Sequence, residues 1–354
     1  MRLQACEIEL RERHPWRVAD HGFDAIPALV VGVEHDGMVG LGEAPAFRTA
    51  QYNSEISSML GGIDDLAPWL AQRDPETPAG LWPELRGRLI GHPFVLHAVD
   101  VALWDLWGKL QHSSVRTLVG ADGPVGAVSA YSIGLDDPHI MLQKMLERPG
   151  WPVYKVKVAG PEHLEILALL RSKTDAPFYV DGNCAWQVED LRANLDTLAD
   201  LGVVLLEQPL PTNAWEEMPA IRARAVFPVI ADESVTNVDD VPRCVDGFDG
   251  VNIKLPKLGG LSPSVAVARA AQEHGLSIML GCMPESTIGI SATAQLAAWA
   301  DHLDLDSALL LADDPGVGVG LDESGRLQFP TSPGTGALLR TDLQKLLPLT
   351  AGRP

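Results

Sequence analysis

Three carboxylates stand at the ends of three consecutive apolar runs of the chain. Asp181 closes FYVD, Glu207 closes VVLLE, and Asp232 follows PVIA. Three acids brought together without a cation would repel one another and lose hydration, so they are either protonated or share a metal. Oxygen ligands alone favour magnesium over zinc. Any one of these acids could merely cap a helix, but their regular spacing predicts a Mg²⁺ site.

Lysines close two other runs. In the segment Lys155-Val156-Lys157, strand alternation would place both ammonium groups on one face and Val156 on the other. Lys254 ends the run VNIK. A desolvated lysine beside another cation loses part of its proton affinity and can act as a general base. A solvated edge strand is the alternative for the first pair, but its place one unit before Asp181 favours the site.

These residue types predict proton transfer at a carbon next to a carboxylate. A metal would bind the carboxylate, while Lys157 and Lys254 would flank the α-carbon on opposite faces. One lysine would remove the α-proton and the other would return one, which inverts the stereocentre. Lys257 competes with Lys254, but it follows Pro256 and belongs to the next loop or helical turn.

Two kinds of domain must position these residues. Residues 1–45 alternate like antiparallel strands, with a hairpin turn expected at His35-Asp36-Gly37, and roughly residues 53–118 have apolar residues at helical spacing. Residues 1–122 therefore predict a small α+β capping domain. Residues 326–354 form a tail whose segment ALLRTDLQKLL predicts a short helix packing back on the cap.

Residues 123–325 predict an α/β fold, a (β/α) barrel of the TIM type. The ends of successive runs are separated by 24, 26, 25, 22, 27 and 23 residues from Lys157 to Asp304, about the length of one β/α unit. Eight units favour closure over an open doubly wound sheet, and no G-x-G-x-x-G follows the first strand. The runs are AVSAYSI, VYKVKV, FYVD, VVLLE, PVIAD, GVNIK, SIMLG and HLDLD.

Composition excludes several classes of partner. The formal charge of −20 disfavours nucleic acid and anionic membranes. No apolar run is long enough to span a bilayer, and the first residues do not form a signal peptide. The four scattered cysteines argue against a disulfide framework and fit a cytoplasmic location. A homo-oligomer is compatible with the sequence, which leaves the oligomeric state open.

The strand-end motifs KVK, DGN, EQP, ADES and NIKLPKLGG together resemble the muconate-lactonizing branch of the enolase superfamily. The resemblance covers nearly the whole chain and implies an enolase-like capped barrel with a magnesium-dependent enediolate reaction. It implies that Asp181, Glu207 and Asp232 bind Mg²⁺ and that Lys157 and Lys254 are the acid/base pair. Lys155 would support Lys157 and the substrate carboxylate.

Two further motifs, HLDLDS and GCMPES, resemble the dipeptide epimerases of that branch. The resemblance implies that Asp304 and Asp306 bind the α-ammonium group of a dipeptide, and that Glu285 lies near the substrate. A solvated acidic loop is the alternative for the Asp pair. Pro284 stands where a leucine or isoleucine is usual. His21 stands where alanyl-glutamate epimerases carry an arginine, so an apolar or basic second residue is as plausible as glutamate.

The predicted reaction is therefore inversion at the C-terminal residue of a dipeptide, by 1,1-proton transfer between two lysines. The nearest rivals are an N-acylamino acid racemase, a synthase of the succinylbenzoate type and a muconate cycloisomerase. Their substrates have no free α-ammonium group and give no reason for the Asp304–Asp306 pair. A non-catalytic barrel would need no flanking lysines.

Overall fold

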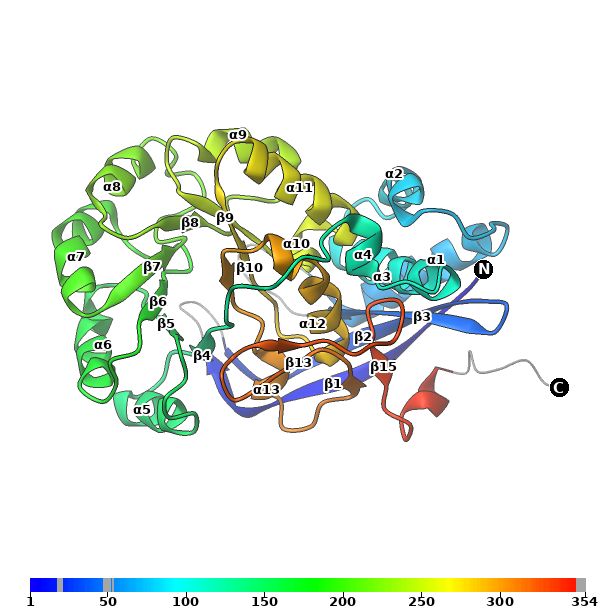
Figure 1. Ribbon diagram of the computed structural model, residues 1–354, viewed down its shortest axis with the longest axis horizontal. Helices are drawn as coiled ribbons and strands as arrows, with labels where there is room; N and C mark the ends of the chain where they lie inside the picture. The colour runs from blue at the N-terminus through cyan, green and yellow to red at the C-terminus, as the bar shows by residue number, and fades with distance from the viewer. Residues whose placement is uncertain (18–21, 47–51, 53, 348–354) are drawn as a thin grey trace.

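The computed structural model describes residues 1–17, 22–46, 52 and 54–347, which form an N-terminal sheet with helices and a parallel barrel (Figure 1). The sheet has three strands in the order β1-β2-β3, and their antiparallel pairing is as predicted. Asp36 and Gly37 form the β2–β3 turn, both with positive φ. The elements of this part are β1 (Arg2–Arg17), β2 (Gly22–His35), β3 (Met38–Pro45), α1 (Ile56–Leu70), α2 (Pro78–Arg88), α3 (Pro93–Leu110) and α4 (Val115–Val119).

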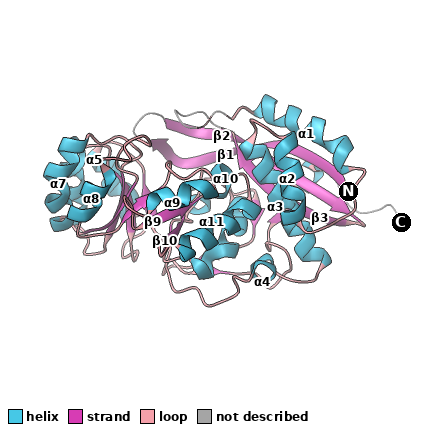
Figure 2. Ribbon diagram, turned by 90° about the horizontal axis from the view of Figure 1, so that it is seen from above, coloured by secondary structure: helices cyan, strands magenta, loops and turns pink. Residues whose placement is uncertain are grey.

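Helix α3 is the centre of the cap. It packs so closely on β3 that a Cβ at Gly40 or Gly42 would lie 2.0 Å from a carbonyl oxygen of α3, so only glycine fits at these positions. Figure 2 shows α1, α2 and α3 gathered over the three-stranded sheet. The other side of α3 faces the barrel, which explains why almost all of its residues are buried.

The predicted eight runs are the eight strands of one parallel sheet, in the order β11-β10-β9-β8-β7-β6-β5-β4. A bridge between Ser129 and Leu303, and a hydrogen bond of 2.9 Å from the Ala130 N–H to the Leu303 carbonyl, join the two outermost strands. The expected closed barrel is therefore confirmed. Its strands are β4 (Tyr131–Ile133), β5 (Tyr154–Lys157), β6 (Phe178–Asp181), β7 (Val203–Glu207), β8 (Val229–Ala231), β9 (Gly250–Ile253), β10 (Ser277–Leu280) and β11 (His302–Leu303).

Helices cover the outside of this barrel, and alternate strand residues pack against them. The inside holds a small apolar layer of Tyr179, Leu205, Ile230 and Met279 below the strand ends. None of the helices in the described part of the chain is long and apolar enough to cross a membrane. The barrel helices are α5 (Pro138–Leu146), α6 (Leu164–Arg171), α7 (Val188–Asp200), α8 (Met218–Arg224), α9 (Val241–Cys244), α10 (Leu255–Leu258), α11 (Leu261–Glu273), α12 (Thr287–Thr293) and α13 (Ser307–Leu310).

Two buried acids of α3 hold the cap to the rest of the chain. The Asp100 carboxylate accepts hydrogen bonds from the N–H and hydroxyl of Ser262, at 2.9 and 2.6 Å, in the first turn of α11. The Asp105 carboxylate accepts from the N–H groups of Leu41 and Thr335, at 2.8 and 2.7 Å. These bonds join the cap sheet, the barrel and the C-terminal tail, so the cap has a fixed place over the barrel.

The tail packs on the cap, but the prediction of a helix over residues 337–347 is wrong. Leu338–Leu339 is a strand, β15, that pairs with β12 (Gly316–Val317), and only Gln344–Leu346 forms a 3₁₀ turn. Ala337 and Leu339 are buried while Leu338 is exposed, which is the period of a strand. Leu339 and Leu347 share an apolar cluster with Val30 of the cap. A separate hairpin, between β12 and β15 in the sequence, consists of β13 (Gly320–Leu321) and β14 (Leu327–Gln328).

The domain boundaries remain predictions. The boundary after residue 122 falls in the irregular segment between α4 and β4, and the boundary after residue 325 falls in the turn of the β13–β14 hairpin.

Candidate active site

The carboxyl ends of the barrel strands bring the predicted acids and lysines into one buried group. Lys157 lies opposite Asp181 in the register of β5 and β6, and Asp181 lies opposite Glu207 in that of β6 and β7. Asp232 follows β8 directly, and Lys254 follows β9. Strands β5 and β9 are four places apart in an eight-stranded barrel, so Lys157 and Lys254 enter the mouth from opposite sides.

The two lysines of β5 point into the barrel, as alternation predicts, while Val156 packs outward against the helices. The Lys155 ammonium lies 2.6 Å from Asp304 Oδ2, 2.7 Å from Glu207 Oε2 and 3.1 Å from Asp181 Oδ2. The Lys157 ammonium lies 2.6 Å from Asp181 Oδ2. Lys155 is thus enclosed by three acids, whereas Lys157 contacts one.

Two lysines after β9 share Asp232. The Lys254 ammonium lies 2.6 Å from Asp232 Oδ2, and the Lys257 ammonium lies 2.6 Å from Oδ1 and 2.5 Å from the backbone oxygen. Lys257 lies in the short helix α10, as predicted, and the structure gives it the more enclosed place of the two. Lys254, at the end of the strand, faces the centre of the mouth and also lies 3.8 Å from Glu207 Oε1.

These contacts set the protonation of the acids. Burial favours a neutral acid, but Lys157 and Lys155 hold the pKa of Asp181 below its usual range, and Lys254 and Lys257 do the same for Asp232. Burial, followed by the charge of Asp181, raises the pKa of Glu207 to about 8. Of these three acids, Glu207 is therefore the one whose negative charge the lysines compensate least.

Lys155 and Lys254 do not have the lowered pKa expected of a buried lysine beside another cation. Burial alone would lower the pKa of Lys254, but Asp232 and Glu207 raise it well above the usual value. The same competition, with Asp304 and Glu207 as the main acids, raises the pKa of Lys155. The acids next to Lys155 and Lys254 outweigh burial and the neighbouring cation, so Lys254 holds its proton unless Asp232 shares its charge with a further cation.

The acids fit a hard cation by their chemistry. Asp181, Glu207 and Asp232 offer only oxygen, which suits Mg²⁺. The buried Glu207 Oε2 makes no hydrogen bond, since its approach to Lys155 is an ion pair without hydrogen-bond angles. Within the described residues, no three His, Cys, Asp or Glu side chains converge as a ready metal cluster, and Lys155 lies between Asp181 and Glu207.

Asp304 and Asp306 form a second acidic group at the same mouth. The Ser132 hydroxyl donates to Asp304 Oδ1 at 2.9 Å and lies 3.1 Å from Asp306 Oδ1, and the Ser132 N–H donates to Asp306 Oδ2 at 2.6 Å. Leu305 packs outward, so both carboxylates point the same way, as predicted. Burial and the charge of Asp304 raise the pKa of Asp306 to about 7.

Glu285 is fully buried, as are Glu207 and Asp232. Its Oε2 accepts a hydrogen bond of 2.9 Å from the Met283 N–H, and its Oε1 lies 3.8 Å from Nε2 of the fully buried His97 of α3. Burial raises the pKa of Glu285 to about 8 and lowers that of His97 to about 3. Met283 packs into the cap core, so the loop that contains Pro284 joins barrel and cap. His21 lies outside the described residues.

Sequence reasoning missed three residues that hold the acids in place. The Asn252 amide donates to Glu207 Oε1 at 2.8 Å, and the Gln208 side chain accepts from the Asp232 N–H at 2.9 Å. The third is Ser132. Asn252 could have been found, because it lies two residues before Lys254 on β9 and so points into the barrel. Gln208, after β7, and Ser132, on β4, contact residues far away in the sequence, and no local pattern shows such contacts.

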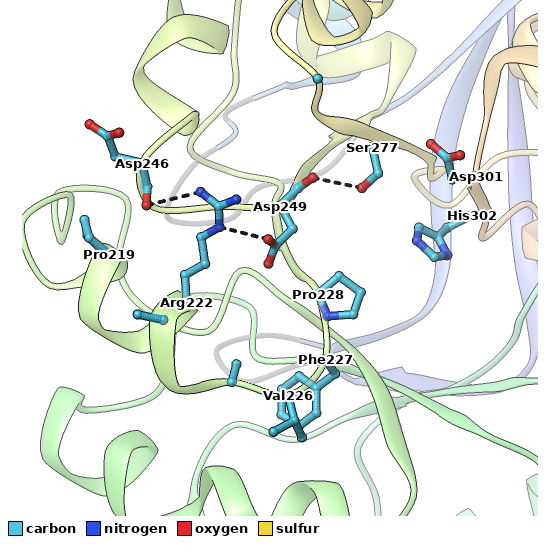
Figure 3. Close-up of a pocket in the computed structure, with 13 residues that line it drawn as sticks. Pro219, Arg222, Val226, Phe227, Pro228, Asp246, Asp249, Ser277, Asp301 and His302 are labelled. Atoms are coloured by element: carbon cyan, nitrogen blue, oxygen red, sulfur yellow. Dashed lines mark hydrogen bonds and ion pairs between the residues drawn. The ribbon is translucent and has the colours of Figure 1, made fainter.

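A surface hollow of about 790 Å³ lies at the other end of the barrel. It lies at the amino-terminal ends of β8 to β11, and Figure 3 shows Arg222, Asp249 and Ser277 turned toward one another. Arg222 bonds Asp249 at 2.8 Å, and the Ser277 hydroxyl donates to the Asp249 carbonyl at 3.1 Å. The reactive groups of a parallel barrel lie at the carboxyl ends of its strands, so this hollow is not the reaction site.

Fold and site together define a capped parallel β/α barrel whose mouth holds buried acids and lysines. Residues 140–343 match the family described as "Enolase C-terminal domain-like", and residues 4–120 match "Mandelate racemase / muconate lactonizing enzyme, N-terminal domain". The chain belongs to the enolase superfamily, in its mandelate racemase/muconate lactonizing enzyme branch. The family inferred from the strand-end motifs is confirmed.

Several known proteins similar to the chain are epimerases by name. The chain is 36% identical to the L-Ala-D/L-amino acid epimerase of Flavobacterium johnsoniae, over 96% of this chain and 100% of that protein. It is 32% identical to the L-Ala-D/L-Glu epimerase of Escherichia coli, over 85% and 91%. A solved structure of the dipeptide epimerase from Methylococcus capsulatus, complexed with Mg and L-Arg-D-Lys, is 29% identical with a TM-score of 0.86 and covers 95% of this chain and 98% of that one.

Proposed function

We propose that this protein is a Mg²⁺-dependent dipeptide epimerase that inverts the α-carbon of the C-terminal residue. The observation that carries the proposal is the placement of Lys157 and Lys254 at the ends of β5 and β9, on opposite sides of one buried mouth. Inversion by two bases requires such opposed groups, whereas a binding protein does not. The similarity to dipeptide epimerases along nearly the whole chain supports it.

Each lysine has one task in each direction of the reaction. The lysine on the side of the α-hydrogen removes the proton, leaving an enediolate, and the ammonium of the opposite lysine donates a proton to the other face. Lys155 stays charged among Asp181, Glu207 and Asp304. It therefore supports the substrate carboxylate and its developing negative charge electrostatically.

Asp181, Glu207 and Asp232 would hold the metal, and Asn252 and Gln208 position two of them. Bound Mg²⁺ would take up part of the charge of these acids and polarise the substrate carboxylate, which makes the α-hydrogen more acidic. Because the metal would share the negative charge of Asp232, that charge would raise the pKa of Lys254 less than it does now.

The Asp304–Asp306 pair would bind the α-ammonium group of the dipeptide. Ser132 orients both carboxylates, and a cation beside Asp306 would relieve the repulsion that raises its pKa. This pair favours a dipeptide over the N-acylamino acids, which carry no cation at that position. The second residue is proposed to be apolar or basic, and the free cysteines of the described chain fit a cytoplasmic location.

The experiment that tests the proposal is a chiral product assay. The purified enzyme with MgCl₂ should convert L-Ala-L-Leu or L-Ala-L-Lys into the L,D epimer, and excess EDTA should stop the conversion. N-acetyl-L-leucine is the comparison substrate. Racemisation of that compound together with failure on every dipeptide would replace the proposal with an N-acylamino acid racemase.

A further inference from the structure

Glu12 of the cap has a place that the proposed reaction does not explain. It lies on β1, where the chain forms an antiparallel bridge with Leu311 next to the barrel mouth. The side chain is only 9% exposed. In the described part of the chain, no hydrogen bond or ion pair reaches its carboxylate. A buried carboxylate without a partner is costly, so its function is worth seeking.

The carboxylate lines a small cavity between cap and barrel. The cavity has a volume of about 20 Å³ and is also lined by Tyr131, Ser132 and Lys144. This is the room for about one water-sized group. Ser132 is the residue that bonds both Asp304 and Asp306, so the cavity adjoins the acidic pair from the side of the cap.

Arg13, His14 and Lys144 also line this cavity, but each contacts a group other than Glu12. Arg13 donates to the Leu311 carbonyl, and His14 lies 2.5 Å from Glu147. The Lys144 ammonium lies 3.1 Å from Asp136 and 3.2 Å from the Pro15 carbonyl, so its hydrogen bonds go elsewhere. Burial raises the pKa of Glu12 to about 7, with the charge of Asp306 as the second cause and Lys144 opposing it. Two neighbouring buried acids would be stabilised by a cation between them.

We propose that Glu12 is a third carboxylate of the site that holds the substrate's α-ammonium group, together with Asp304 and Asp306. The inference rests on the proposed function. An ammonium group has three N–H donors, and the three acids, one from β1 and two from the segment after β11, supply one acceptor for each. The cap thereby takes part directly in recognising the first residue of the dipeptide, in a space that admits a group no larger than an ammonium or methyl.

The test compares binding of two compounds that differ only in the ammonium group. L-Ala-Gly carries it, and N-propionylglycine has hydrogen in its place. Glycine as the second residue has no stereocentre, so calorimetry with the Mg²⁺-loaded enzyme records binding without net conversion. Glu12→Gln keeps the shape of the side chain and removes the charge. Glu9→Gln, on the same strand with an exposed carboxylate paired to Arg11, is the matched control.

The wild type should bind L-Ala-Gly more tightly than N-propionylglycine. Glu12→Gln should weaken L-Ala-Gly roughly tenfold and leave N-propionylglycine unchanged, while Glu9→Gln should change neither. Equal weakening of both compounds in Glu12→Gln would show a structural role and overturn the inference. So would unchanged binding of L-Ala-Gly, or a wild type that binds neither compound or does not distinguish them.

The same measurement separates this inference from the proposed function. If the wild type distinguishes the compounds and Glu12→Gln reduces that difference, the ammonium site stands even where no dipeptide is epimerised. If dipeptides are epimerised but Glu12→Gln behaves like the wild type, only the role of Glu12 fails. Unchanged affinity for N-propionylglycine also shows that the variant is folded.

Discussion

The two sides of the barrel mouth differ in how their acids are compensated. On the side of β5 to β9, Asp181 and Asp232 each contact two lysines at 3.1 Å or less. Among the acids on the side of β11, β4 and β1, only Asp304 contacts Lys155, and no lysine forms an ion pair with Asp306 or Glu12 in the described part of the chain. A dipeptide has a carboxylate at one end and an ammonium at the other. The first side suits the anionic end and its proton chemistry, and the second suits the cationic end.

The largest effects should come from the metal side. Asp181→Asn, Glu207→Gln and Asp232→Asn should each abolish epimerisation, because each removes a charged oxygen ligand from a buried site. Calorimetric titration with MgCl₂ should show binding in the wild type and severe weakening in all three variants. Full activity of the wild type in excess EDTA, or unchanged Mg²⁺ affinity in the variants, would contradict this assignment.

Nearly as large an effect should follow loss of either lysine of the acid/base pair. Lys157→Ala and Lys254→Ala should each stop epimerisation, since one half of the proton relay is missing. Either variant can still exchange the α-hydrogen of one epimer in deuterated water, which NMR detects, and the two variants should select opposite epimers. Lys173→Ala, on the surface, is the control. Near-wild-type turnover in Lys254→Ala would shift the role to Lys257.

A moderate effect is expected on the ammonium side. Asp306→Asn should lower kcat/KM for dipeptides roughly ten- to a hundredfold, the contribution of a charge-assisted hydrogen bond, and leave Mg²⁺ affinity unchanged. Asp246→Asn, exposed at the opposite end of the barrel, is a matched control. If Asp306→Asn lost Mg²⁺ affinity together with activity, the ammonium side and the metal side would not act independently.

The smallest effect should appear in stability at Glu285, outside both sides. Its pKa is raised from 4.5 to about 8 by burial, so the folded state holds a proton that the unfolded state releases between these values. Stability from this group is full below pH 4.5 and is lost as pH rises to about 8. The Tm of Glu285→Gln minus that of the wild type should therefore grow from pH 5 to pH 8. A constant difference, like that expected for exposed Glu273→Gln, would contradict the burial argument.

The sequence predicts the first side of the mouth far better than the second. Asp181, Glu207 and Lys254 each end an apolar run, and the constant length of a β/α unit indicates that such ends meet in space. The same strand-end pattern, together with the family resemblance, indicates Asp304 and Asp306. Glu12 could not be found in this way, because it lies within a long strand of alternating residues.

The remaining misses have other causes. Ser132 bonds Asp304 and Asp306, which lie 172 and 174 residues away, and no local pattern reports a contact across such a separation. The His97–Glu285 approach spans cap and barrel, where α3 reads only as a buried helix. The tail segment 337–347 is misread as a helix because a short apolar cluster fits the period of a helix as well as that of a strand.

The central claim is that opposed lysines invert the residue next to a carboxylate while acids hold an ammonium at the other end. Its most direct test incubates L-Ala-L-Leu and N-acetyl-L-Ala-L-Leu with enzyme and MgCl₂ in deuterated water. Mass spectrometry and chiral separation should show one deuterium at the leucine α-carbon of the L,D product from the free dipeptide, and neither deuterium nor epimer from the acetylated one. Equal exchange and inversion of both compounds would contradict the account, as would inversion without deuterium uptake.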